Sequence, residues 1–223
     1  MTPTELWDTT NDHPRDLMEC VELRQPDPVR ERKWKLAICE FARRAVEALA
    51  LTVDVSLFHA ITGYLDGDLP RVEYEDYRQT DPVGYPGSRE GMDIRLAAAV
   101  GAATAALYVA TASFERLFEC LYWQQAELAF EDPDAELATQ AAIFKNVFGN
   151  LFRPVAFDPV WRTEHTVGLA ARMYENRDFA AMPILADALE EAGCDNADIL
   201  AHCREPGTHV RGCCVVDLLL GKG

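Results

Sequence analysis

Apolar side chains recur every three to four residues through most of this chain, which is the spacing of one face of an α-helix. The first clear case runs from about residue 28 to 51, where Arg and Glu occupy the opposite face. Its apolar positions are Trp34, Ile38, Phe41, Ala45 and Leu49. Pro28 suits the first turn of a helix, where a backbone N–H is not needed. The pattern predicts a helix over 28–51 and a second over 54–65, ended by Asp66-Gly67.

The same periodicity predicts helices through the rest of the chain. Breaking and capping residues indicate their ends: Asp132-Pro133 separates two helices, Thr163 caps another, and Gly193 closes the one that follows. The expected segments are a short helix at 14–22 and further helices at 91–130, 134–148, 163–176, 180–192, 196–203 and 210–220. No segment of any length alternates with the period of a strand. We therefore expect an all-α fold, a multi-helix bundle with a compact C-terminal helical module.

Three parts follow from the positions of proline and acidic residues. Residues 1–27 are expected to form an irregular N-terminal arm. Residues 28–130 form a helical part with a long acidic loop at 67–90, and residues 134–223 form the C-terminal module. The apolar share of 49% is ample for a core, which argues against disorder.

The expected loop at 67–90 contains three Pro, three Gly and three Tyr among its acidic residues. Loops of this length in compact proteins are often functional, and aromatic side chains are good contact anchors. The alternative interpretation is a cover over the core. If the loop is functional, its candidate partner contacts are Tyr74, Glu75, Asp76, Tyr77 and Tyr85.

The net charge of −16 is unevenly distributed. Residues 51–150 carry sixteen acids and six bases, which gives −10 of that total. Such a field repels nucleic acid and anionic lipid, because nucleic-acid affinity depends on Lys and Arg displacing counterions. We expect no direct nucleic-acid binding. The charge favours a protein partner with a basic surface, such as one in a nucleoprotein complex, and simple solubility is the alternative.

The uncharged segment at 96–114 is long enough to span a bilayer, but it is rich in Ala and Gly and lacks a flanking basic cluster or an aromatic belt. We expect a buried helix there, and no membrane association. The first residues lack the basic start and apolar run of a signal peptide. With seven cysteines, an odd number, we expect free thiols and a cytoplasmic location.

Thiols and imidazoles are concentrated in the last thirty residues, where they follow the spacing H-C-x5-H-x3-C. Zinc prefers four nitrogen and sulfur ligands in tetrahedral geometry. Neighbouring residues of a helix point in different directions, so only one of His202 and Cys203 readily joins a given site. The candidate metal ligands are Cys194, His202, Cys203, His209 and Cys213.

Three other interpretations of this tail remain open. The cysteines can be buried as small apolar residues, the commonest fate of a free thiol. A thiol paired with a histidine base can act as a nucleophile. Finally, the basic residues Arg204, His209 and Arg211 either hold an anion or pair with acidic side chains to fasten the turn at Pro206-Gly207.

The tail is expected to form a helix–turn–helix clasp. His209 and Arg211 would hydrogen-bond across the turn to Asp195, Asp198 or a helix-end carbonyl. The large aliphatic residues expected in its core are Ile184, Leu185, Leu189, Ile199, Leu200, Val215, Val216, Leu218 and Leu219.

Several runs in the C-terminal part resemble an uncharacterised bacterial family that shares a C-terminal module. The matching runs are FGNLFRPV (148–155), FAAMPILADALEEAGCDNADIL (179–200) and HCREPGTHVRGCCVVDLLLGK (202–222), with a weaker likeness over 32–49. The pattern FGNxFRPV…MPILADALEEAGC…DILxHCRxPGxHVRGCxVVDLLLGK implies a shared fold module, and the family has no established activity.

No P-loop, dinucleotide fingerprint, zincin or nucleophile-elbow motif occurs. The leading hypothesis is therefore a non-enzymatic, acidic interaction or adaptor protein without a cofactor. The alternative is a zinc-bearing or Cys/His-dependent enzyme centred on residues 194–214.

Overall fold

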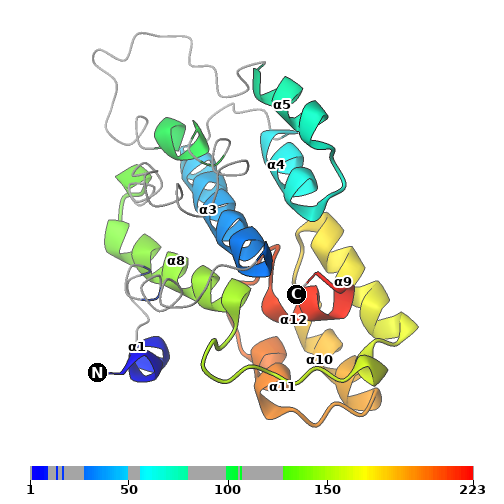
Figure 1. The fold of residues 1–223 in the computed structure, drawn as a ribbon. Coiled ribbons are helices and arrows are strands. Elements are labelled where there is room, and N and C mark those ends of the chain that lie inside the picture. Colours follow the sequence, from blue (N-terminus) through cyan, green and yellow to red (C-terminus); the bar gives the residue numbers. More distant parts are fainter. Residues whose placement is uncertain are drawn as a thin grey trace. The chain divides into compact units, whose positions relative to one another are not determined.

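A computed structural model describes residues 2–9, 14, 17, 28–49, 56–79, 99–104, 106 and 128–222 (Figure 1). The chain divides into two compact units. Unit 1 comprises Met1–Gln25 and Ala141–Gly223, and unit 2 comprises Pro26–Gln140. The division falls inside a helix, whereas the sequence pattern predicts it at Asp132-Pro133. Asp132 instead caps the start of that helix, because its Oδ1 accepts the Ala135 N–H at 3.1 Å.

Within the described residues every regular element is helical, so the all-α prediction is confirmed. The elements in order are α1 (Pro3–Thr9), α3 (Pro28–Ala48), α4 (Ser56–Asp66), α5 (Arg71–Gln79), α8 (Pro133–Phe148), the 3-10 helix η2 (Pro159–Trp161), α9 (Glu164–Asn176), α10 (Met182–Glu191), α11 (Ala197–Arg204) and α12 (Cys214–Leu220). Most of each of the predicted helices at 14–22 and 91–130 lies outside the described residues, and residues 14 and 17, which are described, are helical.

In unit 2, α3 packs against α4 and α4 against α5. The predicted apolar face of α3 is buried at Trp34, Ile38, Phe41 and Ala45. Two ion pairs fasten this helix. Arg32 donates to Asp66 at the end of α4 at 2.6 Å, and Arg44 forms two hydrogen bonds with Glu136, at 3.0 and 2.6 Å.

The prediction of a continuous loop at 67–90 is wrong for residues 71–79, which form α5. The segment is highly polar but still amphipathic, because Tyr74 is fully buried and stacks on Tyr64 of α4 with ring centroids 4.7 Å apart. Arg71 and Glu75 also pair across one turn of the exposed face. The rest of the predicted loop lies outside the described residues.

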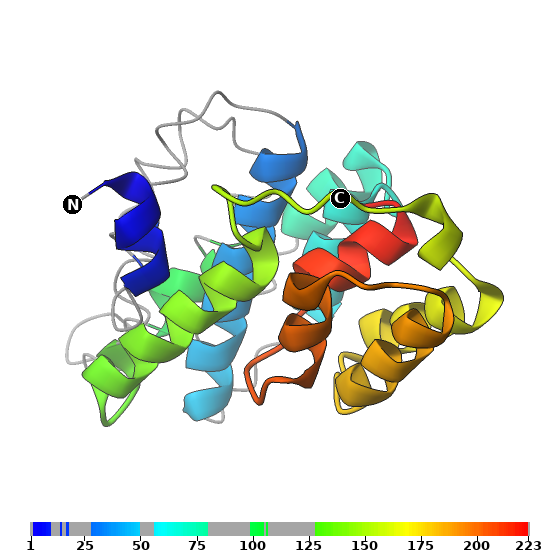
Figure 2. The ribbon, with the colours of Figure 1, turned by 90° about the horizontal axis from the view of Figure 1, so that it is seen from below.

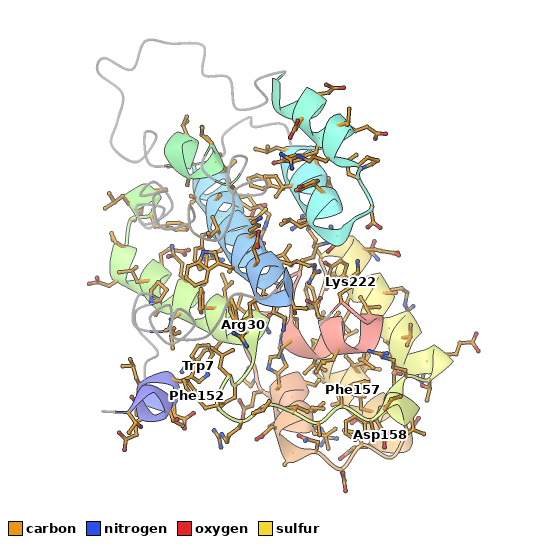
Figure 3. The ribbon with its side chains drawn as sticks, viewed as in Figure 1. Trp7, Arg30, Phe152, Phe157, Asp158 and Lys222 are labelled. Carbon is orange, nitrogen blue, oxygen red and sulfur yellow. The ribbon has the colours of Figure 1, made fainter. Side chains whose placement is uncertain are left out.

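In unit 1, α9 packs against α10 and α12, and α11 packs against α10 and α12 (Figure 2). Thr and Asn, two residue types that favour N-cap positions, cap the starts of α9 and α11. Thr163 and Thr166 form a capping box at α9, and the Asn196 side chain accepts the first free amides of α11. At the other end of this unit, Trp7 of α1 lies edge-on to Phe152 at 6.4 Å between ring centroids (Figure 3).

The last helix begins at Cys214 and not near Val210 as predicted. Gly212 has φ of 92°, which an α-helix excludes, and the Cys213 N–H donates to the Val210 carbonyl at 3.0 Å in a turn. The periodic apolar positions therefore continue through a segment that is not helical.

Burial in the clasp agrees with the expectation at most positions. The side chains of Leu185, Leu189, Ile199, Val215, Val216 and Leu219 are buried. Leu200 and Leu218 are half-buried, and Ile184 is 56% exposed, so its predicted burial is wrong. It follows Pro183 in the first turn of α10, while Met182 and Leu185 face the core.

Among the described residues, no helix has both the length and the apolar character needed to cross a membrane. Most of the uncharged segment at 96–114 lies outside those residues.

Candidate metal centre

Three chain segments of unit 1 converge on one point. The last turn of α11 carries His202, the turn before α12 carries His209, and Cys213 is the residue that precedes the first turn of α12. Asn196 sets the start of α11, and Gly212 lets the chain reverse so that Cys213 faces back toward α11. The end of α8 adds Asn146.

The potential ligand atoms of His202, His209 and Cys213 all lie within 4.8 Å of one another. Cys213 Sγ is 3.2 Å from His202 Nε2 and 4.0 Å from His209 Nδ1. The two imidazole rings meet edge to face, with centroids 5.1 Å apart. Cys213 is fully buried, and the two histidines are half-buried.

Asn146 connects this cluster to α8. Its Oδ1 accepts the backbone N–H of Val210 at 3.2 Å, which fixes the orientation of the amide. The amide nitrogen therefore faces the imidazoles, 2.8 Å from His209 Nδ1 and 3.3 Å from His202 Nε2. Because the amide nitrogen is a donor, His209 Nδ1 accepts with its lone pair.

The site favours a thiolate at Cys213. Burial raises the pKa of this thiol, but the Cys214 side chain, the charge of His202 and the close ring nitrogens of His202 and His209 outweigh burial and hold the pKa well below its ordinary value. Burial lowers the pKa of His202, and the charge of Cys213 and its hydrogen bond reverse this, so that the pKa is raised. The opposite directions of these two shifts are those of neighbouring groups that stabilise each other's charged form.

The donor set fits a soft divalent metal. Zinc binds thiolate at about 2.3 Å and imidazole at about 2.0–2.1 Å, so tetrahedral ligand atoms lie about 3.3–3.6 Å apart. The thiolate–imidazole separations of 3.2 and 4.0 Å bracket that range. Cys214 Sγ lies 3.9 Å from His202 Nε2, so the fourth position is open to this thiol or to water.

Cys194 and Cys203 do not join this group of ligand atoms. Both are buried in the apolar core of unit 1, to which Cys213 also belongs. Burial raises the pKa of both thiols, which disfavours the thiolate form that a metal requires. Of the neighbours His202 and Cys203, only His202 joins the group, as helix geometry predicted.

The basic residues of the turn are used structurally. Arg204 pairs with Asp187 and Glu190 of α10, and Arg211 donates to the carbonyls of Tyr174 and Glu175 at the end of α9 at 2.7 and 3.2 Å. Arg211 thereby fulfils the expectation of a helix-end carbonyl, whereas His209 contacts Asn146 instead of Asp195 or Asp198.

Of the predicted partner contacts, Tyr74 is fully buried and is therefore not available on the surface. Glu75 is half-buried and Asp76 is exposed. The side chain of Tyr77 and all of Tyr85 lie outside the described part of the chain.

Sequence reasoning missed Asn146 and Cys214. Asn146 lies 56 residues before His202, and no local motif connects an asparagine near a helix end to a distant imidazole.

Comparisons with protein-family models, curated proteins and solved structures gave no match.

Proposed function

We propose that this protein binds zinc through His202, His209 and Cys213, and that the metal stabilises the C-terminal part of unit 1. The observation that carries the proposal is the convergence of one sulfur and two nitrogen ligand atoms within 4.8 Å. The ligands come from α11 and from the turn that leads into α12, so one metal would tie these two segments together.

Burial supports a structural role over a catalytic one. Cys213 is fully buried, whereas a cysteine nucleophile must reach its substrate. In addition, the amide of Asn146 lies near the same His202 nitrogen that faces the thiol. An orienting group in a catalytic triad would instead hold the other ring nitrogen.

The test is a zinc titration of the metal-free protein, without a histidine tag, against a chromogenic chelator. Wild type should bind one equivalent, and both His209→Ala and Cys213→Ser should weaken binding by at least about tenfold, as expected for the loss of one ligand. Cys39→Ser removes a buried thiol of unit 2 and should leave the affinity unchanged. Equal affinity in all four proteins would refute the proposal.

A second candidate function is docking of a basic protein partner on the acidic surface. One specific observation favours it. Val72 of α5 is 71% exposed, and it is flanked by exposed Glu73 on a helix whose Asp76 is also exposed. An exposed apolar side chain within a charged surface suits a partner that supplies basic groups around an apolar contact.

The test of this second candidate is capture of partners from native lysate at low and at high salt. The combined substitution Glu73→Lys and Asp76→Lys should abolish salt-sensitive capture, because exposed charge pairs depend on sign and on ionic strength. Asp187→Lys changes an exposed charge of unit 1 and serves as the control. Partner capture that is the same at low and high salt and is unchanged by the two α5 substitutions would contradict this candidate.

A further inference from the structure

Asn146 and a metal ion require the same electron pair. The lone pair of His209 Nδ1 accepts a hydrogen bond from Asn146 Nδ2, with 2.8 Å between the two nitrogens. A metal bound by His209 Nδ1 needs the same lone pair. The hydrogen bond and the metal bond cannot be made together. The amide nitrogen also lies 3.3 Å from His202 Nε2, so it faces two of the three proposed ligand atoms.

The amide is held in this competing position. Val210 donates its backbone N–H to Asn146 Oδ1 at 3.2 Å, and rotating the amide by half a turn would place two N–H donors against each other. Asn146 is only 5% exposed, so water does not freely replace it. The Val210 hydrogen bond and the burial of Asn146 therefore hold its NH2 group toward the two imidazoles.

We infer that Asn146 is an internal competitor for the metal ligands, which sets the zinc affinity of the site and couples metal binding to the anchoring of the turn before α12 on α8. This inference rests on the proposed zinc site. Without metal, the amide anchors His209 to the end of α8. With metal, His209 Nδ1 turns to the ion, and the NH2 end of Asn146 loses that acceptor.

When zinc replaces the amide at His209 Nδ1, one hydrogen bond is exchanged for one metal bond at that nitrogen. A net hydrogen bond is worth little in folded proteins, so the competitor is expected to tune the affinity and not to block binding.

The experiment compares zinc affinity in wild type, Asn146→Ala and Asn150→Ala by competition with a chromogenic chelator. Loss of the competing hydrogen bond should tighten zinc binding in Asn146→Ala by about threefold to tenfold. Asn150→Ala removes the same kind of side chain near the same helix end, where Asn150 bonds Phe152 and Asp8, and its affinity should equal that of wild type. Zinc should also raise the melting temperature of Asn146→Ala by more than it raises that of wild type.

The possible results distinguish the competition by Asn146 from the proposed zinc binding itself. If Asn146→Ala binds zinc as tightly as wild type or more weakly, while binding still requires His209 and Cys213, the inference is overturned and the zinc site stands. If zinc binds to none of the proteins, both fail together. Binding by Asn146→Ala alone would overturn the proposed function of wild type, because the amide would then exclude the metal, and would support the competition at His209.

A measurement on wild type covers the case in which Asn146→Ala does not fold. Side-chain amide signals of 15N-labelled protein are followed while one equivalent of zinc is added. The Asn146 NH2 signals should shift and exchange faster with water, and those of Asn150 should not move. Asn146 signals that are unchanged at saturating zinc would overturn the inference.

Discussion

His202 Nε2 and Cys213 Sγ lie 3.2 Å apart across the turn between α11 and α12. This contact forms because His202 lies in the last turn of α11 and because Gly212, with φ of 92°, reverses the chain just before Cys213. The two residues do not belong to the same helix. The geometry of the turn, and not helical spacing, brings the imidazole to the thiol.

Thiol reactivity should follow burial and not thiolate content. Cys214 is half-buried, whereas Cys39, Cys194, Cys203 and Cys213 are buried. Among these five, Cys214 should be alkylated first in the folded protein, and Cys213 should resist although its pKa is low. Timed alkylation followed by peptide mass spectrometry measures this order. Labelling of Cys213 ahead of Cys214 would show that the site is open to solvent.

Gly149→Ala should destabilise unit 1. Gly149 has φ of 64°, and an added Cβ would lie 3.2 Å from Cys214 Sγ and 3.3 Å from Cys214 Cβ. The backbone conformation alone costs an L-residue about 1–2 kcal/mol. Gly168→Ala is the matched control, because it lies within α9 and a Cβ there meets nothing within 4 Å. Chemical denaturation compares the free energies of unfolding, and equal losses in both variants would contradict the close packing of Cys214.

Arg44→Ala should destabilise unit 2 without changing zinc binding. The substitution leaves the Glu136 carboxylate, whose side chain is 2% exposed, without its two hydrogen bonds from Arg44. The expected loss is about 2–3 kcal/mol in the free energy of unfolding. Arg71→Ala removes an exposed pair within one helix and should leave stability unchanged. A lower zinc affinity in Arg44→Ala would contradict the assignment of the metal to unit 1.

Val216→Ala and Val160→Ala form a matched pair that tests the clasp. Val216 is fully buried in the core of unit 1, whereas Val160 is 64% exposed. Removing two buried methyl groups should cost about 1.5–2.5 kcal/mol, and the exposed substitution should stay within about 0.5 kcal/mol. Thermal melts of both variants with chelator present isolate this packing effect from metal binding. Equal melting temperatures would show that α12 does not stabilise the unit.

Helix caps and the buried face of a long helix were predictable from the sequence. Thr163 caps α9 and Asn196 caps α11, because each cap is decided by residues only two or three positions away. The apolar face of α3 was predictable for the same reason. α5 was missed, since a polar composition hides a helix whose burial depends on one residue, Tyr74.

The site was predictable in its residue types but not in its geometry. The spacing H-C-x5-H-x3-C indicated the residue types, whereas the apolar periodicity predicted a last helix from residue 210 that in fact begins at Cys214. Only the chain reversal at Gly212 shows how His209 and Cys213 meet. The contribution of Asn146 depends on packing between segments that are 56 or more residues apart, which no local pattern encodes.

X-ray absorption at the zinc edge, on zinc-loaded protein without a histidine tag, tests the central claim most directly. The proposed site predicts sulfur scattering at about 2.3 Å together with imidazole nitrogen at about 2.0–2.1 Å. The sulfur shell should diminish or disappear in Cys213→Ser and persist in Cys39→Ser. A zinc environment of oxygen and nitrogen alone in the wild-type protein would contradict the account.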